Sequence, residues 1–202
     1  DVTQNHLGEL QASTLAKWIR AEIFKRTGLT ASAGVAPNKL VAKIASDFRK
    51  PNGLTVVAPE RVEEFMAPLS VGRLWGVGQK TEKRLNEAGF FKVLDLRAST
   101  PQKLKEIFGS FGPELFEQAW GRDERKVVSH WEPKRSGAER TFSSDLQDVS
   151  RLMDQIDALA FEVVSELERK DRLARGVTLK IRYGDFETIT RSQVMKPFTR
   201  DG

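Results

Sequence analysis

The 202-residue sequence contains no cysteine and only two histidines, His6 and His130. Without a thiol, the chain can form no disulfide, no thiolate zinc site and no cysteine nucleophile. Both histidines lie in polar segments, so a transition-metal site is not expected either. Asp185 and Glu187 could pair on a hard metal, but we interpret them as an exposed hairpin turn. The sequence therefore predicts no metal site of its own.

Long apolar runs are also missing. No stretch of about 18 apolar residues occurs, so a membrane partner is not expected. Residues 1–5 contain neither a basic nor an apolar segment, and no signal peptide is expected. The sequence does not begin with Met, and we expect it to be a fragment of a longer, cytoplasmic protein.

Charge is only modestly one-sided. The net charge is +5, and residues 1–57 carry eight Lys and Arg against four Asp and Glu. Residues 58–202 are close to neutral. An excess of this size is compatible with binding a polyanion but also occurs in proteins that bind none. Binding sites must therefore be argued from motifs.

Hydrophobic periodicity predicts an α+β multidomain chain. Residues 1–57 are expected to form part of an α/β layer, with helices at 7–26 and 38–50 and strands at 29–35 and 54–58. Residues 58–126 are expected to form a small all-helical domain, because short helices follow one another between Pro and Gly breaks.

The last part of the chain is predicted to be a separate, incomplete β-α-β-β domain. Residues 127–137 are polar and are interpreted as a linker. Strands are expected at 138–142, 177–183 and 188–194, with a long amphipathic helix over 149–173. Asp148 is expected to cap that helix.

The most informative segment is a Gly-x-Gly turn between two short predicted helices. Glycine allows positive φ and close approach of a ligand. The first amides of the following helix are unpaired, and the helix dipole adds positive charge there, so an anion is favoured. We interpret the segment as a grip on a nucleic-acid backbone that ignores base sequence, made by Gly76, Val77, Gly78, Lys80 and Thr81. A purely structural turn is the alternative.

Two further basic clusters are candidates for phosphate binding. Lys39, Lys43 and Lys50 are spaced by four and seven residues and are expected to lie on one line of a helix, where they could hold a nucleoside triphosphate. Lys180 and Arg182 are expected on one strand face, with Arg140 on another strand, where a duplex could be contacted. The alternatives are an ordinary solvated helix face and an ordinary solvated sheet face.

The order of these segments resembles the Y-family DNA polymerases, especially the bacterial DinB branch. The segment from Ser32 through Lys50-Pro51-Asn52-Gly53 is similar to the late palm of that family. Residues 74–91 resemble its helix-hairpin-helix thumb motif, and residues 108–112 and 120–125 resemble the end of its thumb. Residues 137–142 resemble the entry into its little finger.

The resemblance implies a role for each candidate. Lys50, supported by Lys43, would contact the incoming dNTP, while the hairpin and the basic strand residues would hold primer-template DNA. The domains would be the C-terminal part of the palm (1–57), the thumb (58–126), a linker (127–137) and a truncated little finger (138–202). A sliding clamp is a further possible partner of the full-length protein.

The resemblance also implies what this chain lacks. The family uses two-metal phosphoryl transfer with Mg²⁺, and its metal-binding carboxylates and fingers would precede residue 1. The chain is therefore expected to contain no catalytic or metal-binding residue and to be inactive alone, as part of a translesion DNA polymerase. Two alternatives stay open: a non-catalytic helix-hairpin-helix DNA-binding module, and a helical scaffold that binds protein.

Overall fold

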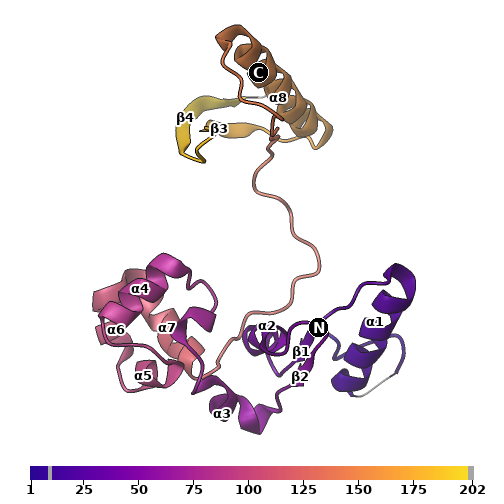
Figure 1. Cartoon of the computed structure of the whole chain (residues 1–202), viewed down its shortest axis with the longest axis vertical. Coiled ribbons are helices and arrows are strands. Elements are labelled where there is room, and N and C mark those ends of the chain that lie inside the picture. The colour runs from indigo at the N-terminus through magenta and orange to yellow at the C-terminus, as the bar shows by residue number, and fades with distance from the viewer. Residues whose placement is uncertain (9–10, 200–202) are drawn as a thin grey trace. The chain divides into compact units, whose positions relative to one another are not determined.

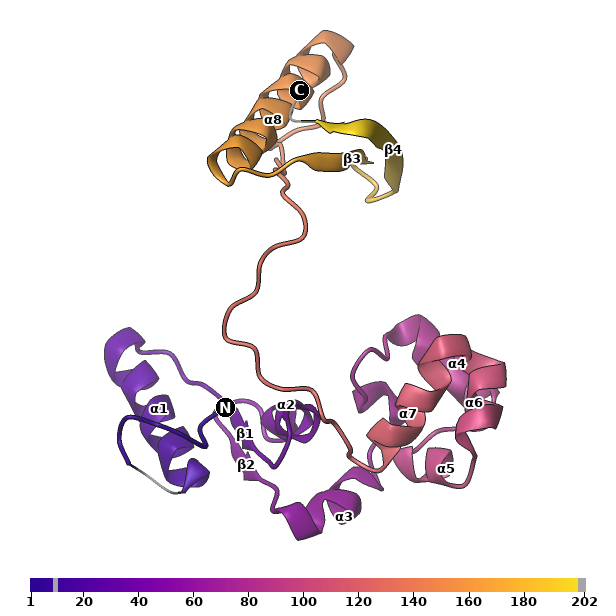
Figure 2. The same cartoon turned by 180° about the vertical axis from the view of Figure 1, so that it is seen from behind.

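The computed structural model describes residues 1–8 and 11–199. The chain forms two compact units, Asp1–Ser129 and His130–Gly202, and Figures 1 and 2 show it from opposite sides. Helices and short sheets occur together, which confirms the mixed α+β class. Among the described residues, none of the helices combines the length and apolar character needed to cross a bilayer.

The first unit begins with two helices around a pair of parallel strands. Helix α1 (Ala12–Thr27) and helix α2 (Lys39–Phe48) lie on opposite sides of β1 (Ala33–Val35) and β2 (Leu54–Val56) (Figures 1 and 2). The strands are shorter than predicted, and α1 begins five residues later than predicted. Gly34 permits the close packing of β1 on α2, because a Cβ there would lie 2.0 Å from the backbone oxygen of Ala42.

Helix α2 forms for the reasons that its sequence indicates. The Asn38 side chain accepts a hydrogen bond of 3.0 Å from the Val41 amide and so caps the helix. The apolar stripe of the helix is buried: Leu40, Val41, Ile44 and Ala45. In contrast, the apolar face of α1 is largely exposed, and only Leu15 is buried there. Leu10, which helical spacing would place on the same face, lies outside the described residues.

Short helices make up the rest of the first unit. In chain order they are η1 (Pro59–Arg61), α3 (Val62–Met66), η2 (Val71–Arg73), α4 (Gln79–Glu87), α5 (Val93–Arg97), α6 (Pro101–Phe108), η3 (Gly109–Phe111) and α7 (Gly112–Ala119). The prolines at 59, 101 and 113 occupy first-turn positions, where their fixed φ suits a helix. One continuous hydrophobic cluster extends from Leu40 to Ala119, so α2 and these helices share a core.

The second unit consists of helix α8 (Val149–Arg169) and an antiparallel hairpin of β3 (Ala174–Arg182) and β4 (Thr188–Thr199). Asp148 caps α8 as predicted, accepting a 2.8 Å hydrogen bond from the Ser150 amide. The predicted strand over 138–142 is wrong, since these residues are irregular. Their charged side chains pair with two different elements, β3 and α8, and no backbone ladder forms. The described part of this unit is therefore α-β-β.

Candidate nucleic-acid interface

The hairpin before α4 has the geometry of an anion-binding turn. Gly76 has φ +82°, a conformation that favours glycine. Gly78 does not share it: its φ of −94° is ordinary, and it serves as the N-cap of α4. Of the two glycines, only Gly76 therefore uses the positive φ that glycine allows. A Cβ at Gly78 would meet nothing within 4 Å, so this corner is open to an approaching ligand.

The amides at the start of α4 are free to bind a ligand. The first backbone hydrogen bond of the helix runs from the Glu82 amide to the Gly78 oxygen, at 2.9 Å. Among the described residues, no acceptor contacts the amides of Gly78, Gln79, Lys80 or Thr81. The first three residues are exposed and Thr81 is partly exposed. Four unpaired donors at the positive end of a helix dipole can receive a phosphate oxygen.

Lys80 adds a cation to this corner. Its side chain is exposed and makes no ion pair with any of the described residues. An ammonium beside free amides strengthens the attraction for a polyanion without selecting a base sequence.

The back of the hairpin is fixed to the first unit's core. The buried side chain of Gln118, from α7, accepts a 3.0 Å hydrogen bond from the Trp75 amide and donates a 3.1 Å bond to the Trp75 oxygen. The Val77 amide donates to the Leu74 oxygen at 3.2 Å, and Val77 packs against the core cluster. The open amides therefore sit on a rigid base.

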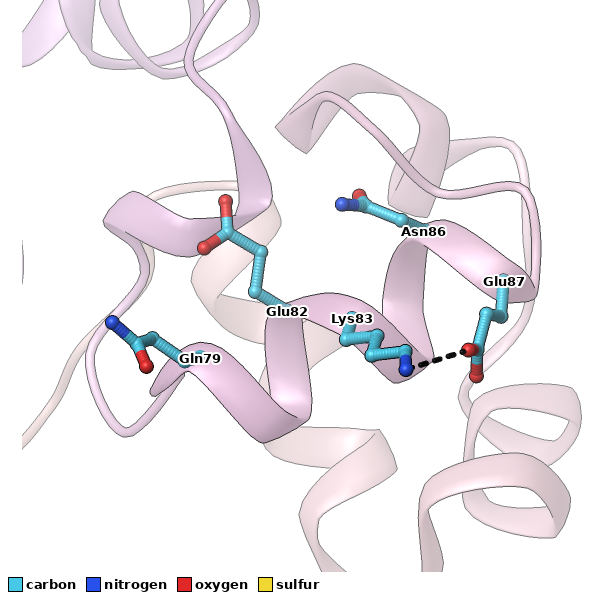
Figure 3. A pocket seen from close by; sticks show the side chains of 5 residues that line it. All are labelled: Gln79, Glu82, Lys83, Asn86 and Glu87. Carbon is cyan, nitrogen blue, oxygen red and sulfur yellow. Dashed lines mark ion pairs between the residues drawn. The ribbon is translucent and has the colours of Figure 1, made fainter.

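A pocket on α4 is not where a phosphate would bind. It is lined by Gln79, Glu82, Lys83, Asn86 and Glu87 (Figure 3). Lys83 already faces Glu87, with 3.9 Å between Nζ and Oε1 (dashed in Figure 3). Two carboxylates against one paired ammonium disfavour an anion, so the candidate grip is the turn itself.

The three lysines do not share one helix face. Helix α2 ends at Phe48, and Lys50 lies beyond it, ahead of the turn at Pro51. That part of the prediction is wrong because the residue before a proline is disfavoured in the helical region. Lys39 is also engaged elsewhere: its Nζ donates a 3.0 Å hydrogen bond to the Lys126 oxygen.

Asp47 joins the other two lysines, and the sequence interpretation missed it. Its carboxylate forms an ion pair with Lys50 and lies 3.7 Å from the Nζ of Lys43. The hydrogen bond from Lys50 holds the pKa of Asp47 below its usual value. Lys50 is not buried, since 60% of its side chain is exposed. Asp47 lies four residues after Lys43 and three before Lys50, and this spacing could have predicted it as the partner of both lysines.

Arg20 holds the turn that carries Lys50. Its guanidinium donates to the Ala31 oxygen at 2.8 Å and to the backbone and side-chain oxygens of Asn52, both at 2.6 Å. Asn52 has φ +54°, an uncommon conformation that asparagine tolerates better than most residues. No sequence pattern indicated this contact, because Arg20 and Asn52 are 32 residues apart.

The β3–β4 hairpin presents a polar, basic face. Lys180 and Arg182 pair in register with Thr190 and Thr188. The Nε of Arg182 donates to the Thr188 hydroxyl at 3.1 Å. Lys180 Nζ lies 2.8 Å from a carboxylate oxygen of Glu139, and this pairing lowers the pKa of Glu139. One of the two cations is therefore partly neutralised.

Arg140 does not belong to this face. It lies in the irregular segment after the linker and interacts with Gln155 and Glu162 of α8. Its predicted place on a strand is wrong, because residues 138–142 are irregular and Glu162 on α8 binds the Arg140 side chain.

Three family models match the chain in order. The impB/mucB/samB family model matches residues 1–47, the IMS family HHH motif matches residues 59–90, and the impB/mucB/samB family C-terminal domain matches residues 133–202. A DNA polymerase IV from Alkalilimnicola ehrlichii is 46% identical over 186 residues, which are 92% of this chain and 52% of that protein. The chain belongs to the Y-family of DNA polymerases.

Other Y-family members agree with this assignment. A DNA polymerase IV from Exiguobacterium sibiricum is 43% identical over 202 residues, which are 100% of this chain and 56% of that protein. A Y-family polymerase chimera of Dbh and Dpo4 has a TM-score of 0.81 at 27% identity, covering 98% of this chain and 57% of that chain. An insertion ternary complex of Dbh polymerase has a TM-score of 0.64 at 27% identity, covering 97% and 56%.

These matches define the place of the hairpin. This Y-family chain spans about half the length of the curated relatives that it matches. The HHH-motif match contains the open turn and lies between the other two family matches. The hairpin is thus one part of a polymerase-family sequence, and a stand-alone DNA-binding module is not favoured.

Proposed function

We propose that this chain is part of a DNA-directed DNA polymerase for translesion synthesis and DNA repair. We assign residues 1–57 to the palm, 58–126 to the thumb, 127–137 to a linker and 138–202 to the little finger. The observation that carries the proposal is the set of unpaired amides at Gly78–Thr81 in a chain of the Y-family. Such an enzyme works on the DNA of the bacterial cytoplasm, where we place this protein.

In this proposal the hairpin holds the primer-template by its backbone. Amides and Lys80 bind phosphate oxygens and no base edge, so the grip works at any sequence. That property suits a polymerase, which must move along its template. The threonine and serine hydroxyls beside Lys180 and Arg182 on the β3–β4 face would add further phosphate contacts.

Lys50 is proposed to receive the triphosphate of the incoming dNTP, with Lys43 as support. Its ion pair with Asp47 keeps the ammonium near the end of α2 while the nucleotide is absent. The ammonium is exposed, and a triphosphate carries more negative charge than one carboxylate, so the nucleotide can compete for it. Asp47 then keeps Lys43 as its partner.

Mg²⁺ is the cofactor expected for the complete polymerase, where it would activate the attacking hydroxyl and stabilise the leaving pyrophosphate. The residues described here do not fit that ion, because no group of three or more His, Asp or Glu side chains among them converges on one point. As the resemblance to the Y-family implies, we propose that the ligands of the metal lie outside this chain. A sliding clamp is a further proposed partner of the full-length protein.

Primer extension tests the function. A polypeptide of these 202 residues should not extend a primer with Mg²⁺ and dNTPs. A full-length polymerase that contains the same 202 residues should extend it under the same conditions. In the full-length protein, Lys50→Ala should raise the KM for dNTP by about tenfold or more, the scale of one lost charge-assisted contact, and leave duplex affinity nearly unchanged. Lys103→Ala, an exposed lysine on α6, is the control. Equal loss of nucleotide use and duplex binding would remove Lys50 from this role.

A further inference from the structure

A buried carboxylate lies where α2 meets the segment after α7. The side chain of Asp123 is only 3% exposed. One of its oxygens accepts a 3.1 Å hydrogen bond from the Leu40 amide, in the first turn of α2. The other accepts from the Arg125 amide at 3.1 Å and from the Arg125 Nε at 2.7 Å. Asp123 therefore caps α2 and also holds the side chain of Arg125.

The ionisation of Asp123 is consistent with its contacts to both Leu40 and Arg125. Burial alone would raise its pKa, but the hydrogen bonds from Arg125 and Leu40 outweigh burial and hold the pKa below its usual value. The carboxylate is thus ionised at neutral pH and fully hydrogen-bonded. Substituting a buried partner of this kind leaves the remaining donors unsatisfied.

Arg125 contacts the hairpin through Trp75. Its guanidinium carbon lies 4.0 Å from the ring centroid of Trp75, the distance of a stacked cation–π contact. Trp75 immediately precedes Gly76, and its backbone is held on both sides by Gln118. A continuous set of contacts therefore links the first turn of α2 to the turn that carries the open amides.

A second contact runs parallel to this one. The Asn38 side chain donates a 2.7 Å hydrogen bond to the Gly121 oxygen, so the N-cap of α2 also touches the end of α7. Gly121 has φ +70°, and a Cβ there would lie 2.3 Å from the Val62 side chain. A side chain at this position would crowd Val62 and strain the backbone, so glycine is favoured here.

We propose that Asp123 and Arg125 are positioning residues that fix the hairpin amides relative to α2. Asp123 orients the guanidinium, the guanidinium holds the indole of Trp75, and Trp75 sets the direction of the turn at Gly76. The buried carboxylate of Asp123 then acts with the Asn38–Gly121 contact and the shared core to hold the distance between the hairpin amides and the helix that leads to Lys50. The structural part stands on the contacts alone, and its importance for DNA rests on the function proposed above.

The first test needs no DNA. Asp123→Asn keeps the shape of the side chain but removes its charge. Asp95→Asn is the matched control, because Asp95 likewise accepts from two backbone amides, those of Phe91 and Lys92, within the same unit. In the 202-residue chain, Asp123→Asn should speed hydrogen exchange about tenfold at both the Leu40 and the Trp75 amides. Asp95→Asn should change neither. Faster exchange at Leu40 alone would overturn the proposal.

The second test uses a fluorescent DNA duplex. Asp123→Asn and Arg125→Ala should each weaken duplex binding by roughly five- to tenfold, the size of a typical coupling within one network. The double variant should bind the duplex about as tightly as the single variant of lower affinity, because both changes break the same set of contacts. If the wild-type chain binds no duplex, the DNA function fails while the exchange result still decides the positioning role. If the wild type binds and both variants bind equally well, the positioning role fails alone.

Discussion

The two units of this chain offer different kinds of candidate phosphate-binding groups, which differ in the packing beneath them. In the first unit, backbone amides at Gly78–Thr81 project from a turn that is bonded to α7. In the second unit, side chains of β3 and β4 project from a two-stranded hairpin. All fully buried hydrophobic residues among those described lie between Leu15 and Ala119, within the first unit.

The difference follows from what each kind of donor needs. Backbone amides have no freedom of their own, so they bind only where packing has fixed the direction of the chain. Lysine and arginine side chains can turn toward a phosphate by rotation and need less support. A dense core is therefore found beneath the amides, while the basic hairpin stands beside α8, which buries none of its residues fully. Four predictions test this contrast.

Removing a core side chain should give the largest effect. Leu115→Ala, at a position with no exposed surface, should lower the free energy of unfolding of the first unit by about 2–5 kcal/mol. Leu159→Ala, at a half-buried position on α8, should cost about 1 kcal/mol in the second unit. Urea unfolding with hydrogen exchange resolved by unit measures both losses. An equal loss in the two units would remove the contrast.

A methyl group at Gly121 should rank next. Gly121→Ala places Cβ 2.3 Å from Val62 in a positive-φ conformation and should destabilise the first unit by about 1–3 kcal/mol. Gly137→Ala is the control, because a Cβ there meets nothing within 4 Å. It should change stability by less than about 0.5 kcal/mol. Thermal unfolding compares the variants. If Gly121→Ala unfolds at the wild-type temperature, the packing around Val62 can adjust to the added methyl group and the prediction is wrong.

Salt dependence should distinguish the two binding faces. Lys80→Ala should lower the slope of log affinity against log salt by about one, as expected for a lost phosphate contact. Lys180→Ala should lower it by less, because Glu139 already offsets that charge. Duplex titrations across a series of salt concentrations measure both slopes, with Lys103→Ala as the reference variant. A larger change for Lys180→Ala would mean that the hairpin face makes the stronger ionic contact.

The smallest effect should come from Glu139. Glu139→Gln frees Lys180 and should raise duplex affinity by at most about threefold, since exposed ion pairs are worth little. Lys180 lowers the pKa of Glu139, so the pair is intact above the ordinary carboxyl pKa and is lost as pH falls through the lowered one. Wild-type affinity should therefore approach that of Glu139→Gln on acidification. A gap between them that persists at low pH would contradict this.

Local patterns predicted the parts of the molecule that depend on neighbouring residues. The Asn38 cap, the buried stripe of α2, the first-turn prolines and the turn before α4 all follow from residues within a few positions of one another. The strand over 138–142 was predicted in the same way and is wrong, because its charged residues pair with β3 and α8. The assignment of Lys50 to a helix failed through its neighbour Pro51.

By itself, then, the sequence determined the helices of the first unit, the glycine turn with its free amides and the family to which the chain belongs. Only the tertiary structure decided that Arg20 holds Asn52 and that Asp123 joins α2 to Trp75 through Arg125. Caps and periodicity act over a few residues and can be recognised in order along the chain. A buried charge finds partners wherever the fold brings donors within about 3 Å, and sequence distance places no limit on that choice.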